Sequence, residues 1–144
     1  MRLWVYKVNI DEENAAYGDW EQLFDDLVAT GIPQAWGGAW ATNKPNDKRH
    51  FTELTSGDRI LAWQSNRQVA VGLLEVDRVE NGGDDVFLKM LERFTQPVPI
   101  NKLKKVHPGL RDVSAFKQGH AGTLYATSSD EAALLLKVCA AAQI

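Results

Sequence analysis

The strongest restriction on the fold comes from two strand-like runs, residues 59–64 and 69–79, that lie only four residues apart. Both runs are rich in apolar and β-branched residues, and the connecting Ser65-Asn66-Arg67-Gln68 has the length and composition of a tight hairpin loop. So short a connection requires the two strands to be antiparallel neighbours. The sequence therefore predicts a β-hairpin over residues 59–79.

Apolar periodicity and capping residues predict three further elements. Residues 3–8 are apolar on both faces of a strand, which is typical of a central position in a sheet. Asp19 is placed to cap a helix over residues 20–30, and Gly31 is placed to end that helix in the left-handed conformation. Ser128 and Glu131 have capping-box spacing and predict a C-terminal helix that runs through Cys139.

The pattern between these elements is more broken. Residues 32–42 predict an irregular loop that enters a short strand at 39–42, and residues 44–54 predict a turn followed by a short helix. Residues 86–94 predict a third strand of the meander, which we expect Pro97 and Pro99 to end. Helical turns at 102–106 and 112–116 and a last strand at 122–127 complete the prediction.

The number and order of these elements predict the fold class. At 144 residues the chain is long enough for one hydrophobic core and too short for two ordinary ones, so we expect a single domain over residues 1–144. Short strands with inserted helices indicate an α+β domain built on a curled, mostly antiparallel sheet or barrel. No apolar run approaches the roughly 20 residues of a membrane helix, and the N-terminus has no signal-peptide core. We therefore expect a cytoplasmic protein with no membrane partner.

Charge is distributed unevenly along the chain. The net charge of −3 argues against a protein that coats nucleic acid by charge alone. Residues 1–31 hold seven acidic and two basic side chains, whereas residues 86–120 hold seven basic and two acidic ones. This asymmetry permits one cationic face on an acidic protein, although a solvated face with no partner has the same pattern.

Catalytic and metal-binding patterns are not found in the sequence. The three histidines, His50, His107 and His120, have no partner at metal-ligand spacing. No glycine-rich phosphate loop follows a strand, and no serine lies in a nucleophile elbow. The single cysteine, Cys139, lies in an apolar helical pattern and is interpreted as a core residue. We therefore expect no metal, no cofactor and no catalysis.

Five tryptophans are more than a small core requires, and an indole is a rigid surface on which another ring can stack. Trp4 and Trp20 have the spacing of core residues. Trp63 alternates with Leu61 on the hairpin and is equally compatible with the core or a pocket. Trp40 follows a glycine pair in an irregular segment, where rings more often face a ligand.

A series of short motifs runs along nearly the whole chain. Trp40-Ala-Thr-Asn43 is followed by Lys48-Arg49, and the hairpin reads Leu61-Ala-Trp63-Gln-Ser65 and then Val71-Gly72-Leu-Leu-Glu75-Val76. The remaining segments are Trp4 to Asn9, Gln96 to Ile100, and Phe116 to Tyr125 with the final helix. In this order, the motifs resemble those of the EVE and YTH branch of the PUA-like superfamily. The loop at 81–85 has no tryptophan and residues 47–49 read Asp-Lys-Arg instead of Asn-Lys-Arg, so the EVE-like domains are the closer match.

The resemblance to EVE-like domains implies a function as well as a PUA-like fold. It implies a non-catalytic module that binds a modified, methylated base flipped into an aromatic pocket, with DNA as the expected partner and RNA as the alternative. Such modules often supply specificity in modification-dependent restriction systems, which makes an effector nuclease or ATPase a further expected partner or fused domain.

A flipped base must be stacked, hydrogen-bonded on its edge and anchored through its phosphates. With the resemblance, this assigns Trp40 and either Trp36 or Trp63 as the walls of the pocket. The expected edge-reading residues are Asn9, Asp11, Thr42, Asn43 and Ser65. The residues expected to hold phosphate are Lys7, Lys48, Arg49, Lys117 and His120.

Three other functions stay open on the sequence. An RNA-processing or nucleoside-hydrolysing enzyme of the related ASCH group would need a Gly-x-Lys-x-x-Glu-x-Arg type signature, which the sequence lacks. A YTH-like RNA reader and a protein-interaction domain with a vestigial pocket are the remaining alternatives.

Overall fold

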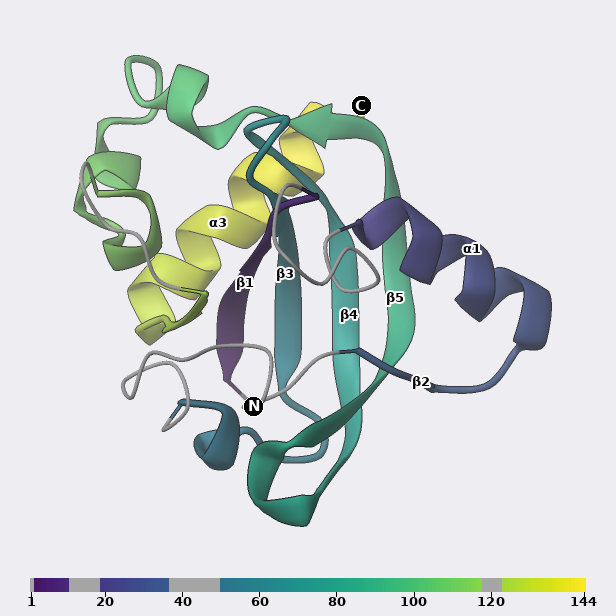
Figure 1. Ribbon diagram of the computed structural model, residues 1–144. Helices are drawn as coiled ribbons and strands as arrows, with labels where there is room; N and C mark the ends of the chain where they lie inside the picture. The colour runs from purple at the N-terminus through teal and green to yellow at the C-terminus, as the bar shows by residue number, and fades with distance from the viewer. Residues whose placement is uncertain (1, 11–18, 37–49, 118–122) are drawn as a thin grey trace.

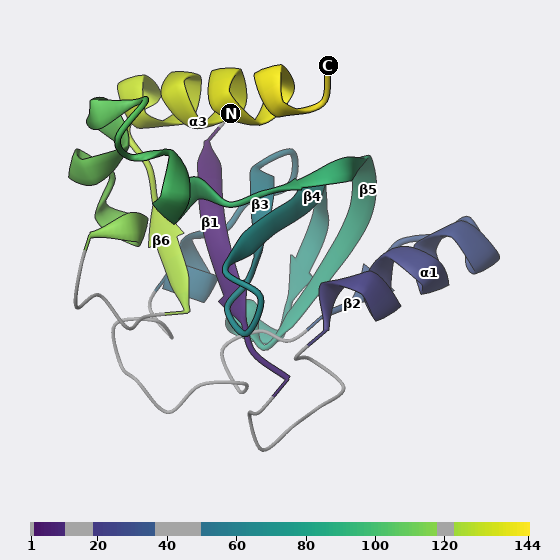
Figure 2. The same ribbon diagram turned by 90° about the horizontal axis from the view of Figure 1, so that it is seen from above.

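The computed structural model describes residues 2–10, 19–36, 50–117 and 123–144. Its centre is a six-stranded sheet with the strand order β2-β5-β4-β3-β1-β6. Figure 1 shows β2 to β1, and Figure 2 shows β6 beside β1. The strands are β1 (Leu3–Val8), β2 (Gln34–Ala35), β3 (Arg59–Gln64), β4 (Val69–Glu80), β5 (Asp85–Val98) and β6 (Leu124–Ala126). Two longer helices, α1 (Trp20–Thr30) and α3 (Ser129–Ala142), lie on opposite sides of the sheet (Figure 2).

The predicted hairpin is confirmed as β3 and β4, which pair antiparallel from Arg59 with Glu75 to Gln64 with Val69. β4 continues into an antiparallel ladder with β5, so the meander is also confirmed. The prediction that Pro97 ends the third strand is wrong, because β5 extends to Val98. The missing N–H of a proline is tolerated there, since β5 pairs with β2 only at residues 87 and 88 and is otherwise an edge strand.

β1 is the central strand that its sequence predicts. It pairs parallel with β3 and antiparallel with β6, and β1 with β3 is the one parallel pair among the described strands. Its side chains alternate between two cores, with Trp4 and Tyr6 in one and Leu3 and Val5 in the other. A strand buried on both faces must be apolar at every position, which explains the continuous apolar run.

Helix α1 begins and ends at the predicted residues. The Asp19 side chain accepts a hydrogen bond from the backbone N–H of Glu21, and Gly31 has φ of 69° in the left-handed region. A Cβ at Gly72 on β4 would lie 2.5 Å from the ring of Phe24 on α1 and 2.6 Å from the carbonyl oxygen of Glu92 on β5. Gly72 is therefore required by the close approach of α1 and of the neighbouring strand, not by a turn.

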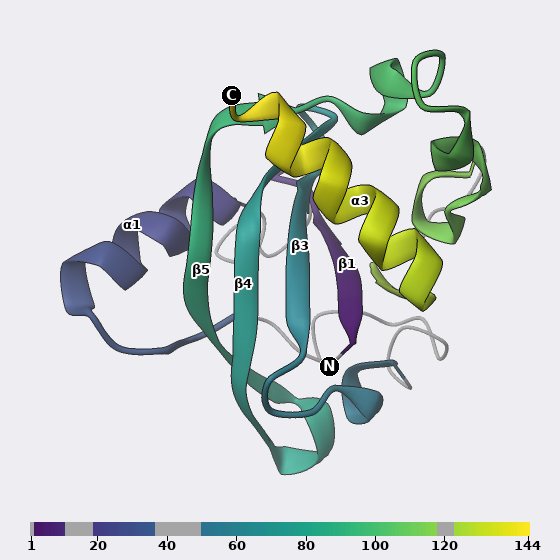
Figure 3. The same cartoon turned by 180° about the vertical axis from the view of Figure 1, so that it is seen from behind.

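Helix α3 covers the other face of the sheet (Figure 3). The predicted capping box is present, with Ser128 and Glu131 bonding each other's backbone N–H. Between β5 and β6, three short 3₁₀ helices replace the two predicted helical turns, at Ile100–Leu103, Pro108–Asp112 and Ser114–Phe116. Another 3₁₀ turn, Asn81–Gly83, joins β4 to β5, and residues 50–53 are helical as expected.

The predicted fold class is confirmed as an α+β domain with a curled, mostly antiparallel sheet flanked by helices. No ladder joins β6 to β2 within the described ranges, so the sheet there is open. Of the predicted last strand at 122–127, residues 124–126 form β6, whereas the predicted strand at 39–42 lies outside the described residues. None of the described helices is long and apolar enough to cross a membrane.

Candidate functional site

Asn9 and Ser65, two of the expected edge-reading residues, lie at neighbouring strand ends. Val8 pairs with Gln64 in the parallel register of β1 and β3. The backbone N–H of Ser65 donates to the carbonyl oxygen of Val8 over 2.8 Å. Both Asn9 and Ser65 are half-buried. The structure therefore brings these two polar residues together at the carboxyl end of the parallel pair.

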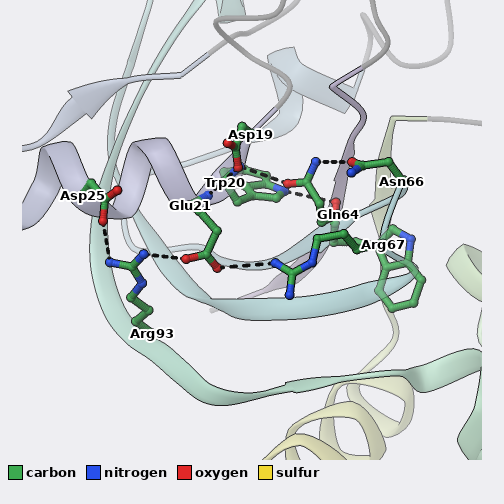
Figure 4. Close-up of polar contacts among 9 residues, drawn as sticks. Asp19, Trp20, Glu21, Asp25, Gln64, Asn66, Arg67 and Arg93 are labelled. Carbon is green, nitrogen blue, oxygen red and sulfur yellow. Dashed lines mark hydrogen bonds and ion pairs between the residues drawn. The ribbon is translucent and has the colours of Figure 1, made fainter.

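Gln64 anchors helix α1 beside this strand end, as Figure 4 shows. It exposes 1% of its surface, its Oε1 accepts from the backbone N–H of Trp20 at 3.0 Å, and its Nε2 donates to Oδ1 of Asn66 at 2.6 Å. The indole N–H of Trp20 donates to the carbonyl oxygen of Trp63 at 3.1 Å. Buried polar groups are costly unless paired, so these bonds hold the start of α1 against the hairpin loop that contains Ser65.

The two wall candidates that the structure describes are both core residues. Trp36 exposes 4% of its surface and packs on Trp20, with ring centroids 5.6 Å apart and an interplanar angle of 33°. Trp63 exposes 2% and makes an edge contact with Phe116 at 4.9 Å. Trp36 lies in the core under α1 and Trp63 in the core under α3, so the two rings do not face a common space.

Lys7 is half-buried near the end of β1, on the sheet face of α3. Its ammonium lies 4.8 Å from the ring centroid of Tyr125 and 5.4 Å from that of Phe116. Burial, with a smaller contribution from the charge of Lys104, lowers the pKa of Lys7 to about 8. The nitrogen of Lys104 itself donates to the carbonyl oxygen of Phe116.

Two of the seven basic side chains in residues 86–120 are neutralised by carboxylates. Lys89 pairs with Glu75 at 3.5 Å, and Arg93 bonds both Glu21 and Asp25 on α1 (Figure 4). Hydrogen bonds to Glu21 and then Asp25 also raise the pKa of Arg93. The other five have no ion pair within the described part of the chain, and they are Lys102, Lys104, Lys105, Arg111 and Lys117. The unpaired cations among the described residues of this stretch therefore all lie in the 3₁₀ segment, residues 100–117.

Seven of the expected site residues lie outside the described residues. They are Asp11, Trp40, Thr42, Asn43, Lys48, Arg49 and His120. The described members of the expected set are Lys7, Asn9, Trp36, Trp63, Ser65 and Lys117, and the last of these is exposed at the end of the third 3₁₀ helix of the segment.

Two residues next to the site were not among the expected site residues. Gln64 could have been found as a polar residue in an otherwise apolar strand. Lys104 belongs to the basic stretch of residues 86–120, but its proximity to Lys7 could not be predicted, because that proximity depends on how the 3₁₀ segment folds back toward β1 and β6 (Figure 2).

A cavity of about 370 Å³ lies at the other end of β1, lined by Arg2, Leu3, Thr127, Ser128, Ser129 and Ala132. The Ser128 hydroxyl is already bonded in the capping box of α3. Because Arg2 and Leu3 begin β1 and Asn9 follows its end, this cavity is separate from the site.

Metal and thiol chemistry find no support in the described ranges. No three His, Cys, Asp or Glu side chains there are close enough to hold a metal ion. Cys139 exposes 1% of its surface, which confirms it as a core residue, and burial raises the pKa of its thiol to about 12.

Comparison with known proteins identifies the fold. No protein-family model and no curated protein match the sequence. Among solved structures, the chain is similar to the DUF55 domain of human thymocyte nuclear protein 1, with a TM-score of 0.72, 13% identity, and coverage of 94% of this chain and 97% of that one. It is also similar to the human THYN1 protein in complex with 5-methylcytosine containing DNA, with a TM-score of 0.70, 11% identity, and coverage of 96% and 98%.

A bacterial structure is similar over the same extent. Protein Atu2648 from Agrobacterium tumefaciens has a TM-score of 0.71 and 18% identity, with coverage of 100% of this chain and 94% of that one. These structural neighbours confirm that the chain has an EVE-like fold.

Proposed function

We propose that this protein is a non-catalytic module that binds DNA carrying a modified, methylated base and holds that base, flipped out of the helix, in an aromatic pocket. The observation that carries the proposal is the fold shared over nearly the full length of both chains with the human THYN1 protein, whose structure contains 5-methylcytosine DNA. At 11% identity the likeness concerns the fold, so the assignment to this chain depends on its own residues.

The pocket is assigned to the carboxyl end of the parallel strands β1 and β3. Asn9 and Ser65 are adjacent there, and their amide and hydroxyl groups provide both donors and acceptors for the edge of a base. In the proposal Trp40 supplies the stacking face. Trp36, buried against Trp20, is a core residue in the proposal and not a wall of the pocket.

In the proposal, the phosphates of the bound DNA strand contact the cationic residues beside this end of the sheet. Lys7 and Lys117 are the described members of the expected phosphate-binding set, and the 3₁₀ segment supplies further unpaired cations. A handful of phosphate contacts gives a measurable salt dependence on a protein of net charge −3. The proposal includes a cytoplasmic setting and an effector nuclease or ATPase as partner.

Binding of short duplexes tests the proposal, with tryptophan fluorescence as the readout. The duplexes differ only in one base, which is cytosine, 5-methylcytosine, adenine or N6-methyladenine. We expect tighter binding of one modified duplex than of its unmodified counterpart, and an unchanged duplex after incubation. Equal affinity for all duplexes would refute modified-base recognition, whereas strand cleavage or base release would favour an enzyme.

Two tryptophan variants separate a stacking ring from a core ring. Trp40→Ala should weaken binding about tenfold or more, since stacking contributes about 1 to 3 kcal/mol per base, with little loss of melting temperature. Trp36→Ala is the matched control and should lower the free energy of unfolding by about 3 to 5 kcal/mol. A large loss of stability in Trp40→Ala, or unchanged affinity, would remove Trp40 from the pocket.

A further inference from the structure

We propose that Lys7 and Lys104 together bind one phosphate group of the bound DNA strand. The rings of Phe116 and Tyr125 line this binding site, which we call the phosphate seat. The proposal rests on the proposed function and adds to it a specific anion site and a dependence of binding on pH. Within the cationic 3₁₀ segment, it identifies Lys104 as the residue that acts together with Lys7.

The seat is built from three separate parts of the chain. Lys7 comes from β1, Tyr125 from β6, and Lys104 and Phe116 from the 3₁₀ segment. Figure 2 shows that segment beside β6 and the adjoining β1. The carbonyl oxygen of Thr123 accepts from the backbone N–H of Lys7 at 2.7 Å, which fixes the position of Lys7 next to β6.

Both ammonium groups contact Phe116, one at its ring and the other at its backbone. The nitrogen of Lys7 is 5.4 Å from the centroid of the Phe116 ring, and the nitrogen of Lys104 donates to the Phe116 carbonyl oxygen. Tyr125 offers Lys7 a second ring face at 4.8 Å.

Neither ammonium group has a carboxylate partner in the part of the chain that the structure describes. Among the described residues, no ion pair joins Lys7 or Lys104 to a carboxylate, whereas Lys89 and Arg93 both have one. Among the described residues, the charged or titratable groups near Lys7 are the cation of Lys104 and the phenol of Tyr125, and β3 contributes the uncharged Trp63 beside it.

Two neighbouring cations without a carboxylate repel each other and favour an anion between them. A phosphate would accept charge-assisted hydrogen bonds from both nitrogens, which are the strong kind of protein hydrogen bond. It would also stabilise the protonated form of Lys7, whose pKa is about 8 in the free protein. Binding therefore takes up a proton above pH 8, and affinity should fall as pH rises.

Lys7→Arg and Lys7→Met test this coupling. For a group with a pKa of about 8, the protonated fraction falls about tenfold between pH 7 and pH 9, so the affinity of the wild-type protein for its preferred modified duplex should fall by up to about tenfold. Lys7→Arg keeps its charge and should bind equally well at both pH values. Lys7→Met should bind weakly at both.

Salt dependence tests Lys104 independently of pH. Lys104→Met and Lys7→Met should each reduce the slope of log affinity against log salt by about one, the value for one phosphate contact. Lys137→Met, at an exposed position of α3 outside the cationic segment, is the control and should leave both the salt slope and the pH dependence unchanged. An NMR titration of the Lys7 side-chain carbons should show its pKa rising when the duplex is added.

Failure of the seat and failure of the proposed function give different results. A wild-type protein that does not distinguish modified from unmodified duplexes contradicts the proposed function. A wild-type protein that does distinguish them, with the salt slope unchanged in both Met variants or the same pH curve in Lys7→Arg, overturns the seat alone. An unchanged Lys7 pKa in the complex would also overturn it, even if a variant failed to fold.

Discussion

Replacing Asp58 by alanine should be one of the most destabilising single changes in this protein. Asp58 exposes 4% of its surface, and its carboxylate accepts three hydrogen bonds at the turn before β3. Oδ2 accepts from the indole N–H of Trp4 and from the backbone N–H of Thr55, both at 3.1 Å, and Oδ1 accepts from the backbone N–H of Arg2 at 3.2 Å. One side chain thus joins the start of β1 to the start of β3.

The magnitude follows from the burial of the three donors. A hydrogen bond to a charged group contributes about 1.5 to 3 kcal/mol, and a buried donor left without a partner costs about 1 to 3 kcal/mol. Trp4 is fully buried, so its indole N–H finds no water after the substitution. The two backbone donors are part-buried and recover some solvation. We therefore expect Asp58→Ala to lower the free energy of unfolding by about 3 to 5 kcal/mol, a large share of the 5 to 15 kcal/mol that is typical of a domain.

Urea unfolding followed by circular dichroism measures this loss, and two further variants assign it. Asp58→Asn keeps the volume and one acceptor oxygen, so it should cost about 1 to 2 kcal/mol. Trp4→Phe removes the indole donor, and the double variant with Asp58→Ala should be less destabilised than the sum of the single ones. A loss below about 1 kcal/mol in Asp58→Ala, or strict additivity in the cycle, would refute the reasoning.

Three other variants test separate parts of the structure. Gly72→Ala should lower the free energy of unfolding by about 1 to 3 kcal/mol or more, the usual cost of overpacking, which thermal melts would show. The reason is that the added Cβ meets the ring of Phe24 and the backbone of Glu92. Gln64→Leu should loosen the start of α1, seen as faster amide hydrogen exchange there with slow exchange kept in α3. Burial holds the pKa of Lys7 at about 8 in the folded state, below its ordinary 10.5. Between these pH values the unfolded chain binds more protons than the folded one, so the free energy of unfolding should rise with pH. Lys7→Met should remove that rise, which melting curves at pH 7.5 and 10 would show.

For much of the candidate site, the sequence predicts which types of residue are needed but not where they lie or how deeply they are buried. Asn9 and Ser65 could be named because each adjoins a recognisable strand, and the structure places them side by side. The burial of Trp36 and Trp63 could not be predicted, because a tryptophan next to glycines or in an alternating strand suits a core as well as a pocket. The sequence also does not determine which cations form ion pairs, because the carboxylates that pair with Lys89 and Arg93 lie on other elements.

The sequence by itself determined the elements whose signals are local. The hairpin follows from alternation and a four-residue connection, and the ends of α1 and α3 follow from Asp19, Gly31 and Ser128, whose hydrogen bonds or backbone angles involve residues only a few positions away. Only the tertiary structure decided which residues meet across long stretches of chain. The parallel pairing of β1 with β3, the bond from Trp4 to Asp58 and the approach of Lys104 to Lys7 join residues that local periodicity does not relate, because these contacts depend on how whole elements pack.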